Sequence, residues 1–140
     1  MMAQRRPAFS LVELMVVIII IGLLSTLVAV QTRSYLIAGK QNAARAEIST
    51  IVSALESFYA DQSRYPTNDE GIEILTVGTR SFPDGFLKKV PTDPWRRPYE
   101  YVSPAVNSPF DVVCLGGDGR EGGDGGDADI SSEDLNAKRR

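Results

Sequence analysis

The most constraining feature of this chain is an apolar run over residues 9–30 that carries one charged residue, Glu13. As an α-helix the run would rise about 33 Å, close to the hydrocarbon thickness of a bilayer. The rest of the 140-residue chain is too small to bury such a helix on every side. The sequence therefore predicts a transmembrane helix over residues 9–30. Arg5 and Arg6 precede it, so the positive-inside bias places the N-terminus in the cytoplasm and the remainder across the membrane.

The composition excludes several classes of function. The chain has no histidine and one cysteine, Cys114. It therefore cannot use histidine for acid–base catalysis or zinc binding, and it cannot form an internal disulfide. A formal net charge of −3 argues against a nucleic-acid partner, which would need a basic face. These observations predict a protein that is not an enzyme and binds no nucleic acid.

The residues at the start of the apolar run form a recognisable processing signal. Ala8 precedes Phe9-Ser10-Leu11-Val12-Glu13, and no small-residue cleavage site follows the run. This arrangement resembles the signal of type IV pilins and type II secretion pseudopilins, which usually carry Gly at the position of Ala8. The resemblance implies that residues 1–8 are a cytoplasmic leader peptide. It also implies that a prepilin peptidase cuts between Ala8 and Phe9 and methylates the new amine of Phe9.

Glu13 requires a reason, because a carboxylate inside an apolar span is costly unless it is neutralised. In an isolated monomer it could be protonated or reach the headgroups, since it lies only four residues into the span. In the resembled family the matching glutamate pairs with the N-terminal amine of a neighbouring subunit during filament assembly. The resemblance thus implies that Glu13 pairs with the methylated amine of Phe9 in a second copy of the chain.

The segment after the apolar run continues as a helix with one apolar face. Apolar residues recur there at i, i+3, i+4 and i+7 spacing: Ile48, Ile51, Val52, Leu55, Phe58 and Tyr59. The simplest prediction is one helix from about Phe9 to about Gln62, in which residues 31–62 are amphipathic and continue into a globular head. The head is predicted to comprise residues 63–140, because the residue before Pro66 disfavours the α conformation.

The head is predicted to combine a short amphipathic segment with a β-hairpin. The segment covers residues 69–77, with Ile72 and Leu75 buried. Strands are predicted over residues 99–102 and 110–115, and the proline-containing loop between them favours an antiparallel hairpin. The predicted fold class is therefore α+β: a long N-terminal helix packed on a small antiparallel sheet.

Three single residues of the head have simpler predicted roles. Trp95 and Tyr99 are expected to pack in the core and hold the proline-rich loop against the long helix. Cys114 is expected to be a small buried residue of the second strand.

Four motifs of the head point to one family. They are Arg64-Tyr65-Pro66-Thr67, Glu70-Gly71-Ile72, Val90-Pro91-Thr92-Asp93-Pro94-Trp95 and Pro98-Tyr99-Glu100-Tyr101. They resemble the major pseudopilins of type II secretion, the G-type subunits of the type IV pilin-like superfamily. The resemblance implies a structural subunit of the periplasmic pseudopilus that drives protein export by the type II secretion system.

The same resemblance implies where this subunit resides and what it contacts. It implies a single-pass bacterial inner-membrane protein that assembles as a helical homo-oligomeric filament in the periplasm. Its expected partners are minor pseudopilins, the prepilin peptidase and the inner-membrane secretion platform. Two alternatives stay open: a type IV pilin for adhesion, motility or DNA uptake, and a membrane-anchored calcium-binding module of the periplasm. A mere anchor, however, gains nothing from an acid at Glu13.

The stretch 116–130, called the acidic loop from here on, is the candidate ligand site. It combines many glycines with four carboxylates, which belong to Asp118, Asp124, Asp127 and Asp129. Hard oxygen ligands without Cys or His suit Ca²⁺, although composition alone fits a solvated tail equally well. A G-x-G-x-x-G match begins at Gly117, but no βαβ unit surrounds it.

The family resemblance favours the calcium interpretation of the acidic loop. Major pseudopilins carry a similar Leu-Gly-x-Asp-Gly…Asp-Ala-Asp-Ile segment that binds a calcium ion. The resemblance implies that the ligands of this Ca²⁺ come from five residues: Leu115 through its carbonyl, Asp118, Asp124, Asp127 and Asp129. Relatives often have an aromatic residue soon after this segment, where the present chain has Ser131-Ser132-Glu133.

Overall fold

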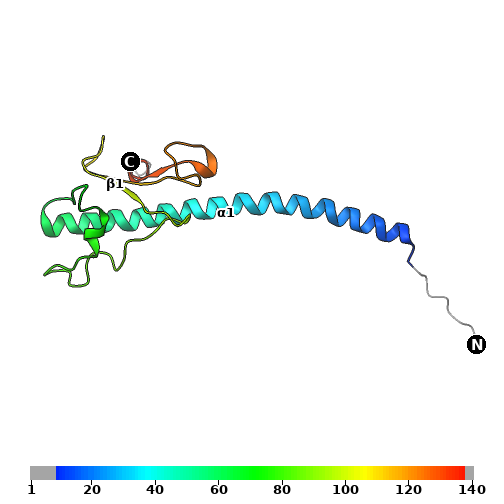
Figure 1. Cartoon of the computed structure of the whole chain (residues 1–140), viewed down its shortest axis with the longest axis horizontal. Coiled ribbons are helices and arrows are strands. Elements are labelled where there is room, and N and C mark those ends of the chain that lie inside the picture. The colour runs from blue at the N-terminus through cyan, green and yellow to red at the C-terminus, as the bar shows by residue number, and fades with distance from the viewer. Residues whose placement is uncertain (1–8, 138–140) are drawn as a thin grey trace, which may run out of the picture. The chain divides into compact units, whose positions relative to one another are not determined.

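The computed structural model describes residues 9–137, except for the side chains of residues 27–32 and Asn136. The elements in chain order are α1 (Leu11–Gln62), η1 (Ile72–Thr76), β1 (Glu100–Val102), β2 (Asp111–Cys114), η2 (Gly125–Asp127), β3 (Ile130–Ser131) and α2 (Ser132–Ala137) (Figure 1). The chain divides into two compact units, residues 1–36 and residues 37–140. The second unit is called the head below.

Helix α1 confirms the expected long helix. It ends at Gln62, four residues before Pro66. Ser63 adopts a left-handed conformation with φ 55°, and its N–H donates to the Tyr59 carbonyl at 2.8 Å. A left-handed residue directly after the last turn is a common way to end a helix, because it turns the chain away while satisfying a free carbonyl.

The predicted hairpin is present and is extended by a third strand. Strands β1 and β2 pair antiparallel with Tyr101 opposite Val112. Strand β3 adds to the other side of β2, also antiparallel, with Ile130 opposite Cys114. The sheet order is therefore β1-β2-β3. The two-residue strand β3 and the six-residue helix α2 were not predicted, because elements this short show no periodicity.

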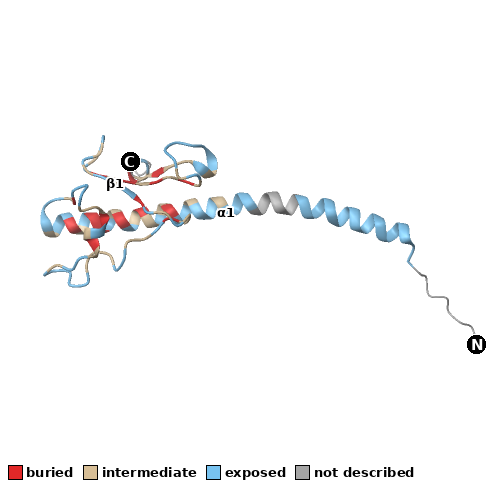
Figure 2. Cartoon of the chain, viewed as in Figure 1, coloured by how far each residue is buried: buried red, intermediate tan, exposed pale blue. Residues whose placement is uncertain are grey.

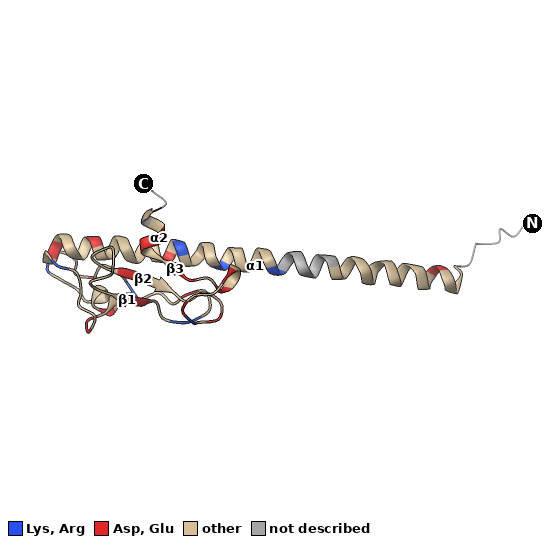
Figure 3. Cartoon of the chain, turned by 90° about the horizontal axis from the view of Figure 1, so that it is seen from above, with Lys and Arg blue, Asp and Glu red and all other residues tan. Residues whose placement is uncertain are grey.

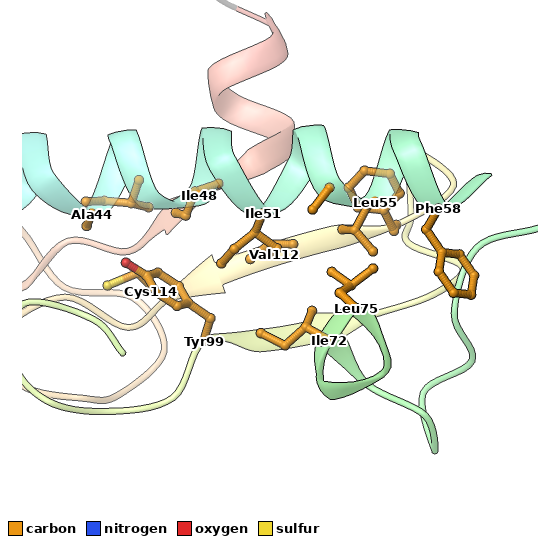
Figure 4. Packing of buried hydrophobic residues seen from close by; sticks show 13 residues of the cluster. Ala44, Ile48, Ile51, Leu55, Phe58, Ile72, Leu75, Tyr99, Val112 and Cys114 are labelled. Carbon is orange, nitrogen blue, oxygen red and sulfur yellow. The ribbon is translucent and has the colours of Figure 1, made fainter. Parts of the chain in front are cut away.

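The core of the head lies between one face of α1 and the elements that cover it (Figures 2 and 4). Its fully buried members from both sides are Ala44, Ile48, Ile51, Leu55, Ile72, Leu75, Val112 and Cys114. Val52 is only partly buried. The inclusion of Tyr59 in this face was wrong, because its side chain is exposed and stacks on the ring of Tyr65 with centroids 4.7 Å apart. The predicted burial of Ile72, Leu75 and Cys114 is confirmed.

Trp95 and Tyr99 do pack against α1. Tyr99 is 5% exposed, and its hydroxyl donates to the Glu47 carboxylate on α1. Burial raises the pKa of Tyr99 well above its usual value of 10. The ring of Trp95 lies 5.6 Å from the amine of Lys40, also on α1, and packs against the core. Both aromatic residues thereby hold the segment before β1 on the helix.

Candidate functional site

The N-terminal segment begins with a capped helix. The hydroxyl of Ser10 accepts the Glu13 N–H at 3.2 Å, and α1 starts at Leu11. The spacing Ser10-x-x-Glu13 is that of a capping box, a signal that the sequence analysis did not use. Glu13 is exposed on the first turn, where a carboxylate also complements the positive end of the helix dipole. The expected cleavage site joins Ala8 to Phe9. Phe9 is exposed, and Ala8 lies outside the described residues.

Within the first unit the apolar side chains of α1 are uncovered on every side of the helix (Figure 2). The exposed residues are Leu11, Val12, Leu14, Met15, Val16, Val17, Ile18, Ile19, Ile20, Ile21, Leu23 and Leu24. Such a surface is stable only when lipid or other protein covers it. In the part of the chain that the structure describes, no helix reaches the combined length and hydropathy of a membrane span. The expected span 9–30 also includes residues 27–30, whose side chains lie outside the description.

The acidic loop is closed by backbone hydrogen bonds. The Gly117 N–H donates to the Gly126 carbonyl at 3.0 Å, which joins the start of the loop to its end. Gly116 has φ +56°, and a Cβ there would overlap the Asp127 carbonyl, so only glycine allows this close approach. The Leu115 carbonyl accepts the Gly119 N–H at 3.0 Å and keeps a second lone pair for another partner.

The four aspartates of the loop have different surroundings. Asp118, Asp124 and Asp127 are exposed, and Asp118 Oδ1 accepts the Arg120 N–H at 3.1 Å. Asp129 is half-buried, and its Oδ2 accepts the Gly122 N–H at 2.8 Å. Over residues 9–137, no three acidic or cysteine side chains gather closely enough to form a metal cluster.

Asp129 nevertheless has an unusual second oxygen. Its Oδ1 is buried and has no hydrogen-bond partner among the described residues. A buried carboxylate oxygen without a donor costs free energy, and a bound cation would remove that cost. The donor set of the loop, carboxylates and carbonyls without nitrogen or sulfur, is the set that calcium prefers. The donor types of the loop therefore fit a calcium ion, whereas its aspartates do not converge on one point in the described residues.

Two polar side chains from outside the loop hold it to the head, and neither could be predicted from the sequence. Gln41 on α1 donates to the Gly125 carbonyl at 2.5 Å. Arg97 donates from Nη2 to the carbonyls of Gly116 at 2.5 Å and Gly117 at 3.1 Å. Figure 3 shows the charged residues of this part of the head. No spacing in the sequence connects these residues, because their contacts are long-range.

The chain that leaves the loop is held by two carboxylates. Asp111 accepts hydrogen bonds from the hydroxyls of Ser131 at 2.8 Å and Ser132 at 2.6 Å. Glu133 accepts from Ser108 Oγ at 2.8 Å and from the Asn107 N–H at 3.1 Å. These hydrogen bonds form a polar anchor for the segment that follows the acidic loop.

Comparison with known proteins agrees with the fold and the motifs. The family model described as "Type II secretion system (T2SS), protein G" matches residues 32–133. This chain belongs to that family. A second model, "Prokaryotic N-terminal methylation motif", matches residues 4–29. The type II secretion system core protein G of Pseudomonas aeruginosa is 39% identical over 96% of this chain and 99% of its own length. That of Vibrio cholerae is 37% identical over 94% of each chain.

A solved structure supports the fold of this protein G family member. The major pseudopilin of the type 2 secretion system of enterohaemorrhagic Escherichia coli superposes with a TM-score of 0.57 at 24% identity. The match covers 68% of this chain and 87% of the pseudopilin. The matched part of the chain, a long helix with a small antiparallel sheet, thus has the type IV pilin-like fold.

Family membership also decides between the pseudopilin and the two alternative functions, a type IV pilin and a membrane-anchored calcium-binding module. The chain is a structural pseudopilin subunit of a type II secretion system and not an enzyme. It assembles into a pseudopilus with other components of that system.

Proposed function

We propose that this chain is made as a single-pass inner-membrane precursor and polymerises, after removal of residues 1–8, into a periplasmic pseudopilus. The observation that carries this proposal is the all-round apolar surface of α1 from Leu11 to Leu24, which the first unit leaves uncovered. Lipid would cover it in the precursor and neighbouring copies of the helix in the filament. The methylation motif matched over residues 4–29 supports cleavage between Ala8 and Phe9.

Glu13 would provide the register between neighbouring copies. Once the leader is removed, Phe9 carries the free methylated amine, and in the low dielectric of packed apolar helices that charge needs a partner. Glu13 is the one acidic residue of the run 9–30. Its carboxylate on one subunit would pair with the amine on the next and favour one stacking offset over the others.

The other proposed partners follow from this route. A prepilin peptidase would process Ala8–Phe9 at the cytoplasmic membrane face. The inner-membrane platform would then move the processed subunit into the filament, and minor pseudopilins would occupy its tip.

We further propose that the acidic loop binds Ca²⁺. The ligands would be the Leu115 carbonyl together with Asp118, Asp124, Asp127 and Asp129. The unpartnered Oδ1 of Asp129 supports this assignment, and so does the closure of the loop at Gly117 and Gly126. A bound cation would neutralise the carboxylates and stabilise the loop on the head. This role would be structural.

The test of the main proposal is the N-terminal chemistry of the protein extracted from membranes. Intact-mass and N-terminal peptide analysis should show a chain that starts at methylated Phe9. In a matched Phe9→Ala variant, the loss of the mass of residues 1–8 reports cleavage and the added mass of a methyl group reports methylation. The two steps are therefore scored separately. Recovery of only the full-length, unmethylated chain from secretion-competent cells would contradict the proposed route.

A further inference from the structure

The side chain of Arg97 connects the core of the head to the start of the acidic loop. At one end its Nε lies 3.7 Å from Asp93 Oδ2, and its backbone N–H donates to Asp93 Oδ1 at 2.7 Å. The side chain of Asp93 is 2% exposed, so this end is fixed in the interior. At the other end Nη2 binds the carbonyls of Gly116 and Gly117. Arg97 thus joins an immobile carboxylate to two consecutive peptide groups.

The loop is shaped around the guanidinium of Arg97. Gly119 has φ +70°, and a Cβ at this position would overlap Nη1 of Arg97. Gly119 thus leaves the space that the guanidinium occupies, whereas a Cβ at Gly116 or Gly117 would meet Asp127 instead. Residues 115–119, which comprise Leu115 and the start of the acidic loop, are called the first arm below. The first arm therefore folds against a permanent cation that the chain itself supplies.

The first arm contains two of the proposed calcium ligands, the Leu115 carbonyl and Asp118. Hydrogen bonds from Arg97 fix the peptide planes after Gly116 and Gly117, and the second of these planes contains the N–H of Asp118. The Leu115 carbonyl is held next to them by the Gly119 N–H. A site whose ligands are already oriented loses less conformational entropy when it binds.

We propose that Arg97 is a positioning residue that orders the first arm before any metal binds. The effect on calcium affinity rests on the calcium binding proposed above, whereas the order of the first arm does not. The second arm, residues 122–129, shares the Gly117–Gly126 hydrogen bond with the first arm but also has the Gly122–Asp129 and Gln41–Gly125 hydrogen bonds, which do not involve Arg97. Loss of Arg97 should therefore affect the two arms unequally.

The experiment compares full-length wild type, Arg97→Lys and Arg97→Gln in detergent micelles. Arg97→Lys keeps the charge but has a single nitrogen, so it cannot contact Asp93 and the two carbonyls from separate nitrogens as Arg97 does, and it separates geometry from charge. Arg120→Gln, an exposed arginine of the same loop, is the matched control. Amide hydrogen exchange is measured by mass spectrometry without calcium, and calcium affinity by competition with a chelator.

Both Arg97 variants should show exchange in residues 116–119 faster by about tenfold, as expected for loss of a charged hydrogen bond, while Arg120→Gln stays at wild type. Peptides from β1 and β2 should be unchanged. Calcium affinity should weaken by about tenfold in Arg97→Lys, since the charge is kept and only the geometry is lost.

Three results would overturn the proposal or part of it. Wild-type exchange in the first arm of both variants would show that Arg97 does not order it. Equal acceleration in β1 and β2 would show that Arg97 stabilises the whole head instead. Faster exchange with unchanged calcium affinity would show that the order of the first arm does not contribute to calcium binding. A wild type without any calcium response refutes the calcium site, and exchange in the metal-free protein then decides the role of Arg97 by itself.

Discussion

Glu133 accepts hydrogen bonds from both the backbone N–H and the side-chain amide of Asn107, at 3.1 and 3.3 Å. The two residues are 26 positions apart, and their contact closes the C-terminal segment over the loop that joins β1 to β2. The present chain holds the same segment with a half-buried carboxylate.

Glu133→Ala should lower the stability of the head. Each lost hydrogen bond to a carboxylate contributes about 1 kcal/mol or somewhat more, so a decrease of about 1–3 kcal/mol is expected. Thermal unfolding of the full chain in detergent, followed by the fluorescence of Trp95, measures it. Asp134→Ala, an exposed acid on the same helix, is the control and should change little. Equal melting of the two variants would mean that Glu133 is no anchor.

Calcium should raise the melting temperature of the wild type relative to chelator. Binding to the folded state alone adds about 2.7 kcal/mol at a hundredfold excess over Kd. Asp129→Asn should erase most of this difference while leaving the metal-free melting temperature nearly unchanged, because the asparagine oxygen can still accept the Gly122 N–H. Asp118→Ala should act likewise. Identical wild-type curves with calcium and with chelator would refute the calcium site.

Glu13→Leu should leave membrane insertion intact but abolish or strongly impair filament growth and export. The unpaired amine of Phe9 would then be buried without a counter-charge, which is more costly than burying a pair. Membrane fractionation reports insertion, and filament recovery with secretion of an exported enzyme reports assembly. Glu73→Leu, an exposed acid on η1 in the head, controls for a general effect of losing an acid. Normal filaments from Glu13→Leu would defeat the pairing argument.

Stability should depend on pH through Glu70. Its hydrogen bonds with Arg64, at 2.6 and 2.8 Å, lower its pKa from 4.5 to about 2. Because the folded pKa is depressed, this stabilisation is fully present above pH 4.5 and is lost as the pH falls towards about 2. The difference in melting temperature between wild type and Glu70→Gln should therefore be constant near neutral pH and vanish in that acid range. Glu73→Gln, on η1, is the control; a difference that persists at pH 2 would contradict the assignment.

Cys114 should resist alkylation in the folded protein. The residue is 1% exposed, and burial raises its thiol pKa from 9.0 to about 11. The thiolate, which is the reactive form, should be about a hundredfold rarer at pH 8 than in an ordinary cysteine. Iodoacetamide labelling followed by mass spectrometry should be slow in buffer and fast in urea. Rapid labelling of the folded chain would place Cys114 outside the core.

The sequence by itself determined the elements whose signal is local. The apolar periodicity of α1 and the two strand patterns on either side of residues 104–109 involve only residues that are close in sequence. The helix, the hairpin and most of the buried face of α1 could therefore be predicted. Tyr59 is the exception among the residues predicted to be buried. It fits the helical spacing, yet its ring is exposed and stacks on Tyr65. The four aspartates and the motif around Glu13 were likewise visible from residue types and order alone.

The tertiary structure decided which distant groups meet. The contacts of Arg97 with Gly116, of Glu133 with Asn107 and of Tyr99 with Glu47 join residues 19, 26 and 52 positions apart. Hydrogen bonds of this kind depend on donor and acceptor lying within about 3 Å at a suitable angle. That geometry exists only after the chain has packed, and no spacing along the sequence encodes it.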